Sequence, residues 1–141
     1  MTSLSFLDVN VWLALILEHH VHRASALEWW KQTDGIAAFT RLTQLSMLRL
    51  LTTAAAMDGQ PVTMAEAWQA YDRLLEDERV SLYGEPTGLE MRFRKLSQLP
   101  AASPKVWADA YLVAFAEGYR GRLVTFDRAL ENRGADCLVL D

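Results

Sequence analysis

The chain of 141 residues has a single cysteine, Cys137, so no disulfide can form within it. Its core needs no such support, because a chain of this length buries about two-thirds of its unfolded surface. The longest apolar run, 11–17, has seven residues, whereas a membrane-spanning helix needs about 20. Residues 1–4 carry no basic segment before an apolar run, so we expect no signal peptide and no membrane association. These absences favour a reducing, cytoplasmic setting.

The chain also lacks an excess of positive charge. It has 14 Lys and Arg against 18 Asp and Glu, a net charge of −4. A global basic field for nucleic acid is therefore excluded, and any contact with RNA or DNA must come from a local patch. The candidates are Arg92, Arg94 and Lys95, and, near the C-terminus, Arg120, Arg122, Arg128 and Arg133.

Short apolar runs alternate with helical patterns along the chain. This order predicts an α/β fold with a parallel sheet, in a single domain over 1–141. The expected strands are 4–7, 36–39, 80–83, 123–126 and 137–140. The expected helices are 11–17, 22–31, 41–52, 63–75, 89–96 and 104–117, with Thr40 and Thr63 as caps, Ser103-Pro104 as a start and Gly118 as a stop.

Apolar residues at helical spacing predict which side of three helices faces the core. The residues are Ala24, Leu27 and Trp30 in helix 22–31, Leu42, Leu45, Leu48 and Leu51 in helix 41–52, and Met64, Trp68, Tyr71 and Leu75 in helix 63–75.

Two aspartates, Asp8 and Asp127, follow expected strands, and a third, Asp109, lies among apolar residues early in a helix. In an open parallel sheet, ligands bind outside the carboxyl ends of the strands. Three carboxylates at that edge would repel one another, and a hard cation such as Mg²⁺ or Mn²⁺ relieves the repulsion. Such ions hold phosphates and orient water in phosphodiester cleavage.

Each acid also has a simpler interpretation. Asp8 is a suitable cap for the first helix, and Asp127 is a suitable cap for a short helix over 128–132. Asp109 could instead pair with an arginine, since buried charges are usually paired.

Four short motifs together resemble the PIN-domain family, and in particular its VapC-type toxins. They are Leu7-Asp8-Val9-Asn10-Val11, the segment from Thr43-Gln44-Leu45 to Leu51, Trp107-Ala108-Asp109-Ala110-Tyr111-Leu112, and Val124-Thr125-Phe126-Asp127. The resemblance covers essentially the whole chain. It implies a three-layer fold with a central, mostly parallel sheet flanked by helices. It also implies a Mg²⁺- or Mn²⁺-dependent endoribonuclease that cleaves tRNA or rRNA and is inhibited by a VapB-type antitoxin.

By the same resemblance, Asp8, Asp109 and Asp127 are the catalytic acids and metal ligands. Thr125 orients this cluster, and Asn10 and Gln44 lie beside it. Gln44 stands where the family usually carries glutamate, so three carboxylates remain instead of four. The number of bound ions, one or two, stays open.

Other interpretations stay open beside the toxin. A non-catalytic PIN-like binding module would explain Gln44, and an aspartate-nucleophile phosphatase would use Asp8, although Asn10 stands where its second acid is expected. We expect the tract of His19, His20 and His22 to be structural or solvated. We also expect a homodimer, because the first helix, Trp29 and the leucine-rich third helix offer more apolar surface than one core needs.

Overall fold

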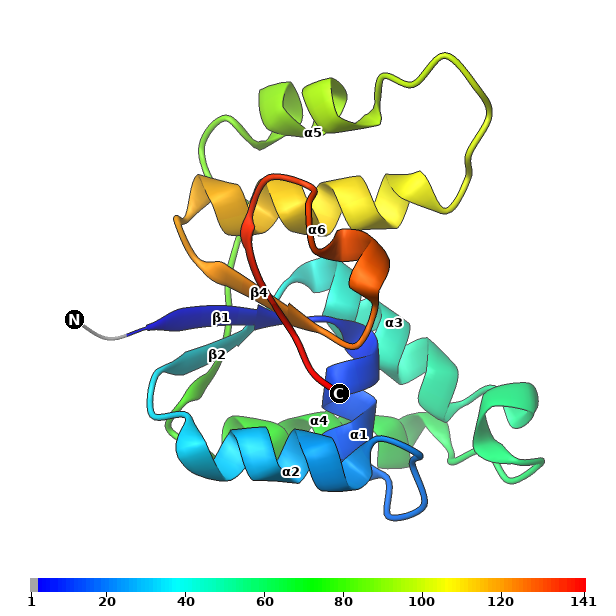
Figure 1. The fold of residues 1–141 in the computed structure, drawn as a ribbon. Coiled ribbons are helices and arrows are strands. Elements are labelled where there is room, and N and C mark those ends of the chain that lie inside the picture. The colour runs from blue at the N-terminus through cyan, green and yellow to red at the C-terminus, as the bar shows by residue number, and fades with distance from the viewer. Residues whose placement is uncertain (1–2) are drawn as a thin grey trace.

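The computed structural model describes residues 3–141, which fold around one five-stranded sheet (Figure 1). All paired strands are parallel, in the order β3-β2-β1-β4-β5. The strands are β1 (Leu4–Leu7), β2 (Ile36–Phe39), β3 (Val80–Leu82), β4 (Arg122–Thr125) and β5 (Asp136–Val139). The helices are α1 (Val9–Ile16), α2 (Arg23–Gln32), α3 (Arg41–Leu51), α4 (Met64–Leu75), α5 (Leu89–Ser97) and α6 (Val106–Gly118), with the 3₁₀ helices η1 (Ala54–Met57) and η2 (Arg128–Leu130).

This arrangement confirms the expected α/β fold, with helices on both faces of a parallel sheet. Met1 and Thr2 lie outside the described residues, and with them part of the segment in which we expect no signal peptide. Within residues 3–141, none of the helices is both long and apolar enough to span a bilayer.

Alternate strand residues supply two separate cores, because successive side chains of a strand point to opposite faces. One core lies under α1 to α4, and the other lies under α6, with α5 packed outside α6 (Figure 1). The strand residues are Leu7, Ala37, Phe39 and Val124 on the first face, and Phe6, Ala38 and Leu123 on the second. Helix α1 is central to the first core, where Trp12 stacks on Phe39 at 3.9 Å between ring centroids. The sheet is packed between these two cores, and the carboxyl ends of its parallel strands lie together at one edge.

Side-chain caps start two helices where the sequence predicts them. The Thr40 hydroxyl accepts a bond from the Thr43 N–H at 3.1 Å, and the Thr40 N–H donates to the Thr43 hydroxyl. Thr63 and Glu66 form the same reciprocal pair at the start of α4. Such boxes satisfy two of the backbone N–H groups that a helix start leaves free.

Helix α6 begins later than the Ser103-Pro104 pair predicts. The backbone N–H of Val106 donates to the Ser103 carbonyl, and that of Trp107 to the Pro104 carbonyl. These residues therefore form a turn, and the capping position falls to Lys105, whose side chain makes no capping bond.

The other end of α6 also differs from the prediction. Gly118 is the last residue of the helix, and the residue with positive φ is Arg120, at 55°. A Cβ on Gly118 would overlap the side chain of Pro86. Glycine is therefore needed here for close packing rather than for a left-handed stop.

The predicted apolar face of α4 is only partly the buried one. Tyr71 is buried together with Ala67, but Met64 is 73% exposed and Trp68 is 49% exposed. The predicted apolar residues therefore lie along the boundary between the core and the surface. The face that is actually buried is shifted by about one residue from the face that the spacing predicts.

The faces of α3 and α2 deviate in the same way. In α3, Thr43 and Gln44 are buried and Leu45 is 59% exposed. In α2, Ala24 is exposed and Ala26 is buried. The polar pair of α3 points inward because this helix starts at the carboxyl edge of the sheet, where polar side chains gather.

Two of the three grounds for a homodimer are therefore wrong. Helix α1 buries Val11 to Ala14 in the core, so they offer no surface to a second copy. Trp29 is partly buried and packs against the same core. Exposed Leu45 is what remains of the argument, and the homodimer stays a prediction.

Candidate active site

Asp8 stands directly after β1 and is held from three directions. Its N–H donates to the Val124 carbonyl at 2.9 Å, its Oδ1 accepts from the Val9 N–H at 2.8 Å, and its Oδ2 accepts from the Thr125 hydroxyl at 2.8 Å. Burial raises the pKa of Asp8, the bonds from Thr125 and Val9 oppose this, and the charge of Asp127 adds to it. Asp8 is thus both the cap of α1 and a fixed, partly desolvated carboxylate.

Asp127 follows β4 with one residue between, because the strand ends at Thr125 rather than at Phe126. Its Oδ1 accepts from the Ala129 N–H at 2.9 Å and so caps η2, while its own N–H donates to the Thr125 hydroxyl at 3.0 Å. The capping interpretations of both acids are correct, and they leave room for a second role. A carboxylate oxygen has two lone pairs, so one capping bond does not exhaust it.

Thr125 joins these two aspartates. The side chain is fully buried, and its one hydroxyl donates to Asp8 and accepts from the backbone of Asp127. A hydroxyl is the smallest group that can do both. Thr125 therefore fixes the spacing between the ends of β1 and β4.

Asp109 approaches the same edge from the first turn of α6. Burial raises its pKa, and the charges of Asp127 and Asp8 raise it further, whereas Lys105 and Arg133 lower it. The three aspartates that the sequence singled out therefore share one electrostatic environment. We call Asp8, Asp109 and Asp127 the acidic edge.

Lys105 belongs to this site and was missed by sequence reasoning. Its Nζ lies 3.9 Å from Asp127 Oδ2, and its charge also reaches Asp109. A cation at the start of a helix is unfavourable for the helix dipole. That misfit, four residues before Asp109, is the signal that could have indicated it.

Gln44 and Asn10 take different positions. Gln44 is buried, and its Oε1 accepts from Arg41 Nη1 at 2.7 Å, with the Tyr71 hydroxyl beside it. Asn10 is exposed in the first turn of α1. The amide of Gln44 is thus engaged by its own helix, and neither residue makes a bond to the acidic edge among the described contacts.

The histidine tract is closer to the site than its place in the sequence indicates. His22 stacks on Phe126 at 4.2 Å between ring centroids, and Phe126 lies between Thr125 and Asp127. The His22 N–H donates to His20 Nδ1 at 3.0 Å. These are packing and hydrogen-bonding contacts, and the structural or solvated role of the tract stays a prediction.

The donor set at the acidic edge suits a hard divalent cation. Within residues 3–141, no three His, Cys, Asp or Glu side chains form a group that could hold a metal ion. Mg²⁺ does not require such a group of three, since it is usually bound through one or two carboxylates and keeps several waters. Burial is the main cause of the raised pKa of Asp109, and the repulsion from Asp127 and Asp8 that raises it further is what such an ion would relieve.

Comparison with known proteins agrees with this geometry. The chain belongs to the PIN domain family, whose model matches residues 5–135. Its relatives include Ribonuclease VapC41 of Mycobacterium tuberculosis, which is 44% identical over 90% of this chain and 91% of the relative. Ribonuclease VapC39 of the same species is 33% identical over 99% of this chain and 98% of the relative.

Solved structures with the same fold include two from toxin systems. VapC20 of Mycobacterium tuberculosis, a Sarcin-Ricin loop cleaving toxin, superposes with a TM-score of 0.69 over 93% of this chain and 95% of that one, at 15% identity. VapBC2 of Rickettsia felis, bound to a DNA fragment from its promoter, gives 0.67 over 98% of this chain and 99% of that one, at 12% identity. At these identities the likeness concerns the fold.

Proposed function

We propose that the protein is an endoribonuclease toxin that cleaves RNA phosphodiester bonds with Mg²⁺ or Mn²⁺. The observation that carries this proposal is the electrostatic coupling of Asp8, Asp109 and Asp127 at the carboxyl edge of the sheet. The relatives named as ribonucleases support the reaction, and the donor chemistry supports the ion.

The chain's own residues have distinct roles in this reaction. Asp8 and Asp109 would hold the ion, with Asp127 supporting it directly or through water. When bound, the divalent ion supplies positive charge to the scissile phosphate and orients the attacking water. Thr125 keeps Asp8 and Asp127 in register, and Lys105 adds positive charge on the open side of Asp127.

A toxin of this kind requires a partner that restrains it. The solved structures of the same fold include VapBC complexes, and we propose a VapB-type antitoxin for this chain. The substrate class is tRNA or rRNA, which together with the unpaired Cys137 indicates the cytoplasm as the place of action. A homodimer is part of this proposal, and sedimentation as a monomer at all concentrations would reject it.

The test is cleavage of purified tRNA and rRNA by the wild type and by Asp109→Asn, with Mg²⁺, with Mn²⁺ and with EDTA. Cleavage should require a metal and should be lost in the variant. Sequencing of RNA 5′ ends after brief expression of the two proteins would then locate the target. Metal-independent cleavage, or full activity of Asp109→Asn, would contradict the proposal. A folded wild type without cleavage or metal binding would favour the non-catalytic module, and a phosphorylated Asp8 would favour the phosphatase.

A further inference from the structure

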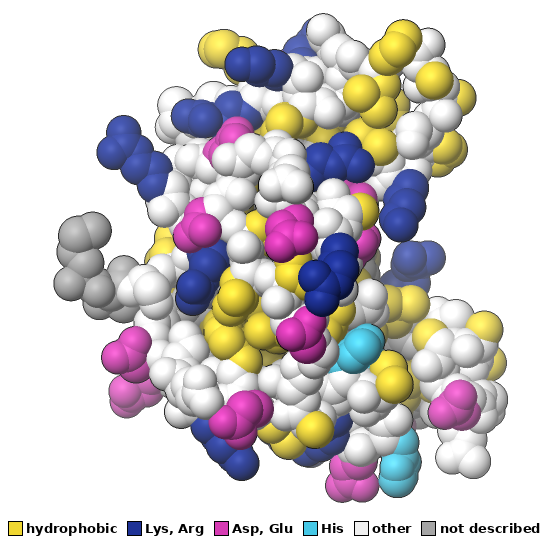
Figure 2. Space-filling model, in the orientation of Figure 1, with side chains coloured by type: hydrophobic (Ala, Val, Ile, Leu, Met, Phe, Trp, Pro, Cys, Tyr) yellow, Lys and Arg dark blue, Asp and Glu magenta, His cyan; other side chains and the backbone are white. Residues whose placement is uncertain are grey.

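A hollow of about 600 Å³ lies between α5, the end of α6 and the segment that leads from η2 to β5. Its charged lining consists of Arg92, Lys95 and Arg133 with one carboxylate, Glu117. The hollow therefore carries a net charge of +2 in a chain whose net charge is −4. We call Arg92, Lys95 and Arg133 the basic hollow. In Figure 2, Lys and Arg side chains gather over α5 and α6 in the upper part of the view.

The single carboxylate of the hollow does little to neutralise it. Glu117 Oε1 lies 3.8 Å from Arg92 Nη1, a long and partly exposed pair. The backbone of Gly134 also lies close to the Glu117 carboxylate, since a Cβ on Gly134 would lie 2.5 Å from Glu117 Oε2. Lys95 and Arg133 make no salt bridge within residues 3–141.

Not all of the basic residues indicated by the sequence share this property. Arg94, on the same helix as Arg92, pairs with Glu90 at 3.0 Å, and Arg128 pairs with Asp141 at 2.8 Å. Of the candidate cations, Arg94 and Arg128 are thus engaged by close carboxylates outside the hollow, whereas Arg92, Lys95 and Arg133 line it.

Arg133 connects the basic hollow to the acidic edge. Its Nε donates to the Ala129 carbonyl at 3.2 Å, and the N–H of Ala129 donates to Asp127. From Asp109 to Glu117, α6 rises about 12 Å at 1.5 Å per residue, which equals about three to four nucleotides of a stacked strand.

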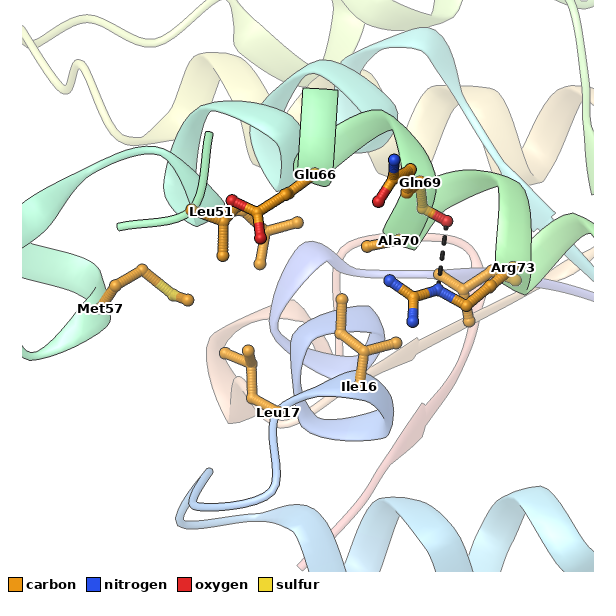
Figure 3. A pocket seen from close by; sticks show the side chains of 10 residues that line it. Ile16, Leu17, Leu51, Met57, Glu66, Gln69, Ala70 and Arg73 are labelled. Carbon is orange, nitrogen blue, oxygen red and sulfur yellow. Dashed lines mark hydrogen bonds between the residues drawn. The ribbon is translucent and has the colours of Figure 1, made fainter. Parts of the chain in front are cut away.

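A second hollow, of about 400 Å³, lacks these features. It lies between the end of α1, η1 and α4, and Figure 3 shows Ile16 and Leu17 facing Glu66 and Arg73 across it. The two charges cancel, none of the predicted site residues lines it, and nothing in the structure shows what covers it.

We propose that the basic hollow binds backbone phosphates of the RNA a few nucleotides away from the bond that is cleaved. This inference rests on the proposed function and adds the direction in which the substrate leaves the acidic edge. Arg92, Lys95 and Arg133 are positioning residues that hold the strand along α6 and take no part in bond cleavage. Phosphate contacts of this kind carry affinity and depend on salt.

The experiment measures binding of a fluorescein-labelled single-stranded RNA of mixed sequence, in EDTA, over a series of salt concentrations. The test variant is Arg92→Gln/Lys95→Gln, the second variant is Arg133→Gln, and the matched control is Arg94→Gln on the same helix. The slope of log K against log salt should fall by about 1.4 in the double variant and about 0.7 in the second, at about 0.7 per phosphate on a single strand. Arg94→Gln should keep the slope of the wild type.

A kinetic measurement with Mg²⁺ separates positioning from chemistry. The double variant should raise KM and leave kcat within about twofold of the wild type, because uniform binding energy is lost. Equal slopes and equal KM in the double variant and in Arg94→Gln would overturn the inference, even if cleavage still depends on Asp109. If the protein binds RNA through the hollow but does not cleave it, the proposed function fails and the binding site stands.

An acidic protein segment is the competing occupant. Polyglutamate that binds as tightly as the RNA, and loses as much affinity in the double variant, would assign the hollow to such a partner and overturn the proposal. Circular dichroism melting of each variant checks that the fold is intact.

Discussion

The acidic edge and the basic hollow lie toward opposite ends of α6, and they hold their charged groups in different ways. At the acidic edge, Asp8 and Asp127 are each fixed by a backbone N–H, and both are tied to the buried hydroxyl of Thr125. In the basic hollow, Lys95 has no such restraint among the described contacts and Arg92 has only its long pair with Glu117, while Arg133 is held by one bond to the Ala129 carbonyl. Cleavage needs groups in fixed positions, whereas attraction of a phosphate backbone tolerates mobile cations.

The largest effect should come from moving a charge at the acidic edge without removing it. Asp8→Glu keeps the carboxylate but shifts it by one methylene, away from the Val9 N–H and the Thr125 hydroxyl. We expect RNA cleavage to fall by at least about 100-fold, since loss of even the partners of a metal ligand costs about 10–100-fold. Initial rates with Mg²⁺ measure this, and Asp72→Glu, which makes the same change at an exposed carboxylate on α4, is the control. Cleavage within about threefold of the wild type would show that the position of this carboxylate does not matter.

Thr125→Val should have the next largest effect. It keeps the shape of the side chain and removes the hydroxyl that joins Asp8 to Asp127. We expect cleavage to fall by about 10–100-fold, and stability to fall by about 1–3 kcal/mol because the buried partners are left unpaired. Thr125→Ser keeps the hydroxyl and should retain most of both. If the Thr125→Val and Thr125→Ser proteins have the same activity and stability, the hydroxyl does not fix the two aspartates, and the contrast between fixed and mobile groups fails.

Asp109→Asn should separate stability from activity. Burial and the neighbouring carboxylates raise the pKa of Asp109 in the folded protein, so the ionised form opposes folding at neutral pH. Without metal, the variant should therefore melt about 1–3 °C above the wild type at pH 7. The difference should shrink as the pH falls and the wild-type carboxyl takes up its proton. A lower melting temperature than the wild type at pH 7 would contradict the repulsion inferred here.

The smallest effect should come from exchanging cations in the basic hollow. Arg92→Lys/Lys95→Arg keeps both charges, and we expect KM for RNA to change by less than about twofold, because a phosphate contact needs charge more than geometry. The same measurement on Arg92→Gln/Lys95→Gln gives the matched loss of charge. A large rise of KM in the exchanged variant would mean that this hollow, too, depends on fixed geometry.

The sequence predicts most of the fold because its signals are local. Thr40 and Thr63 are caps that act within one turn, and the strands are short apolar runs between turn residues. It predicts Asp8 and Asp127 at one edge because parallel strands end at one side of a sheet, whereas Asp109 was singled out by its apolar neighbours in a helix and by the family resemblance. The site residues' roles remain predictions until they are tested.

What the sequence does not predict depends on contacts between distant segments. Gly118 is needed because Pro86, more than thirty residues earlier in the chain, packs against it. The local sequence does not contain this contact, so it predicts only that the glycine ends the helix. The buried face of α4 is set by what packs against it, and the spacing of Met64 and Trp68 carries no such information. Lys105 meets Asp127 only after α6 has packed beside β4.

The most direct test of the acidic edge is a calorimetric titration of the metal-free protein with Mn²⁺. The wild type should bind the ion, and Asp8→Asn and Asp109→Asn should each weaken binding by at least about 10-fold, whereas Asp72→Asn, at an exposed carboxylate on α4, should leave it unchanged. Equal affinity in all four proteins, or no binding by a folded wild type, would show that these carboxylates do not gather around a divalent ion.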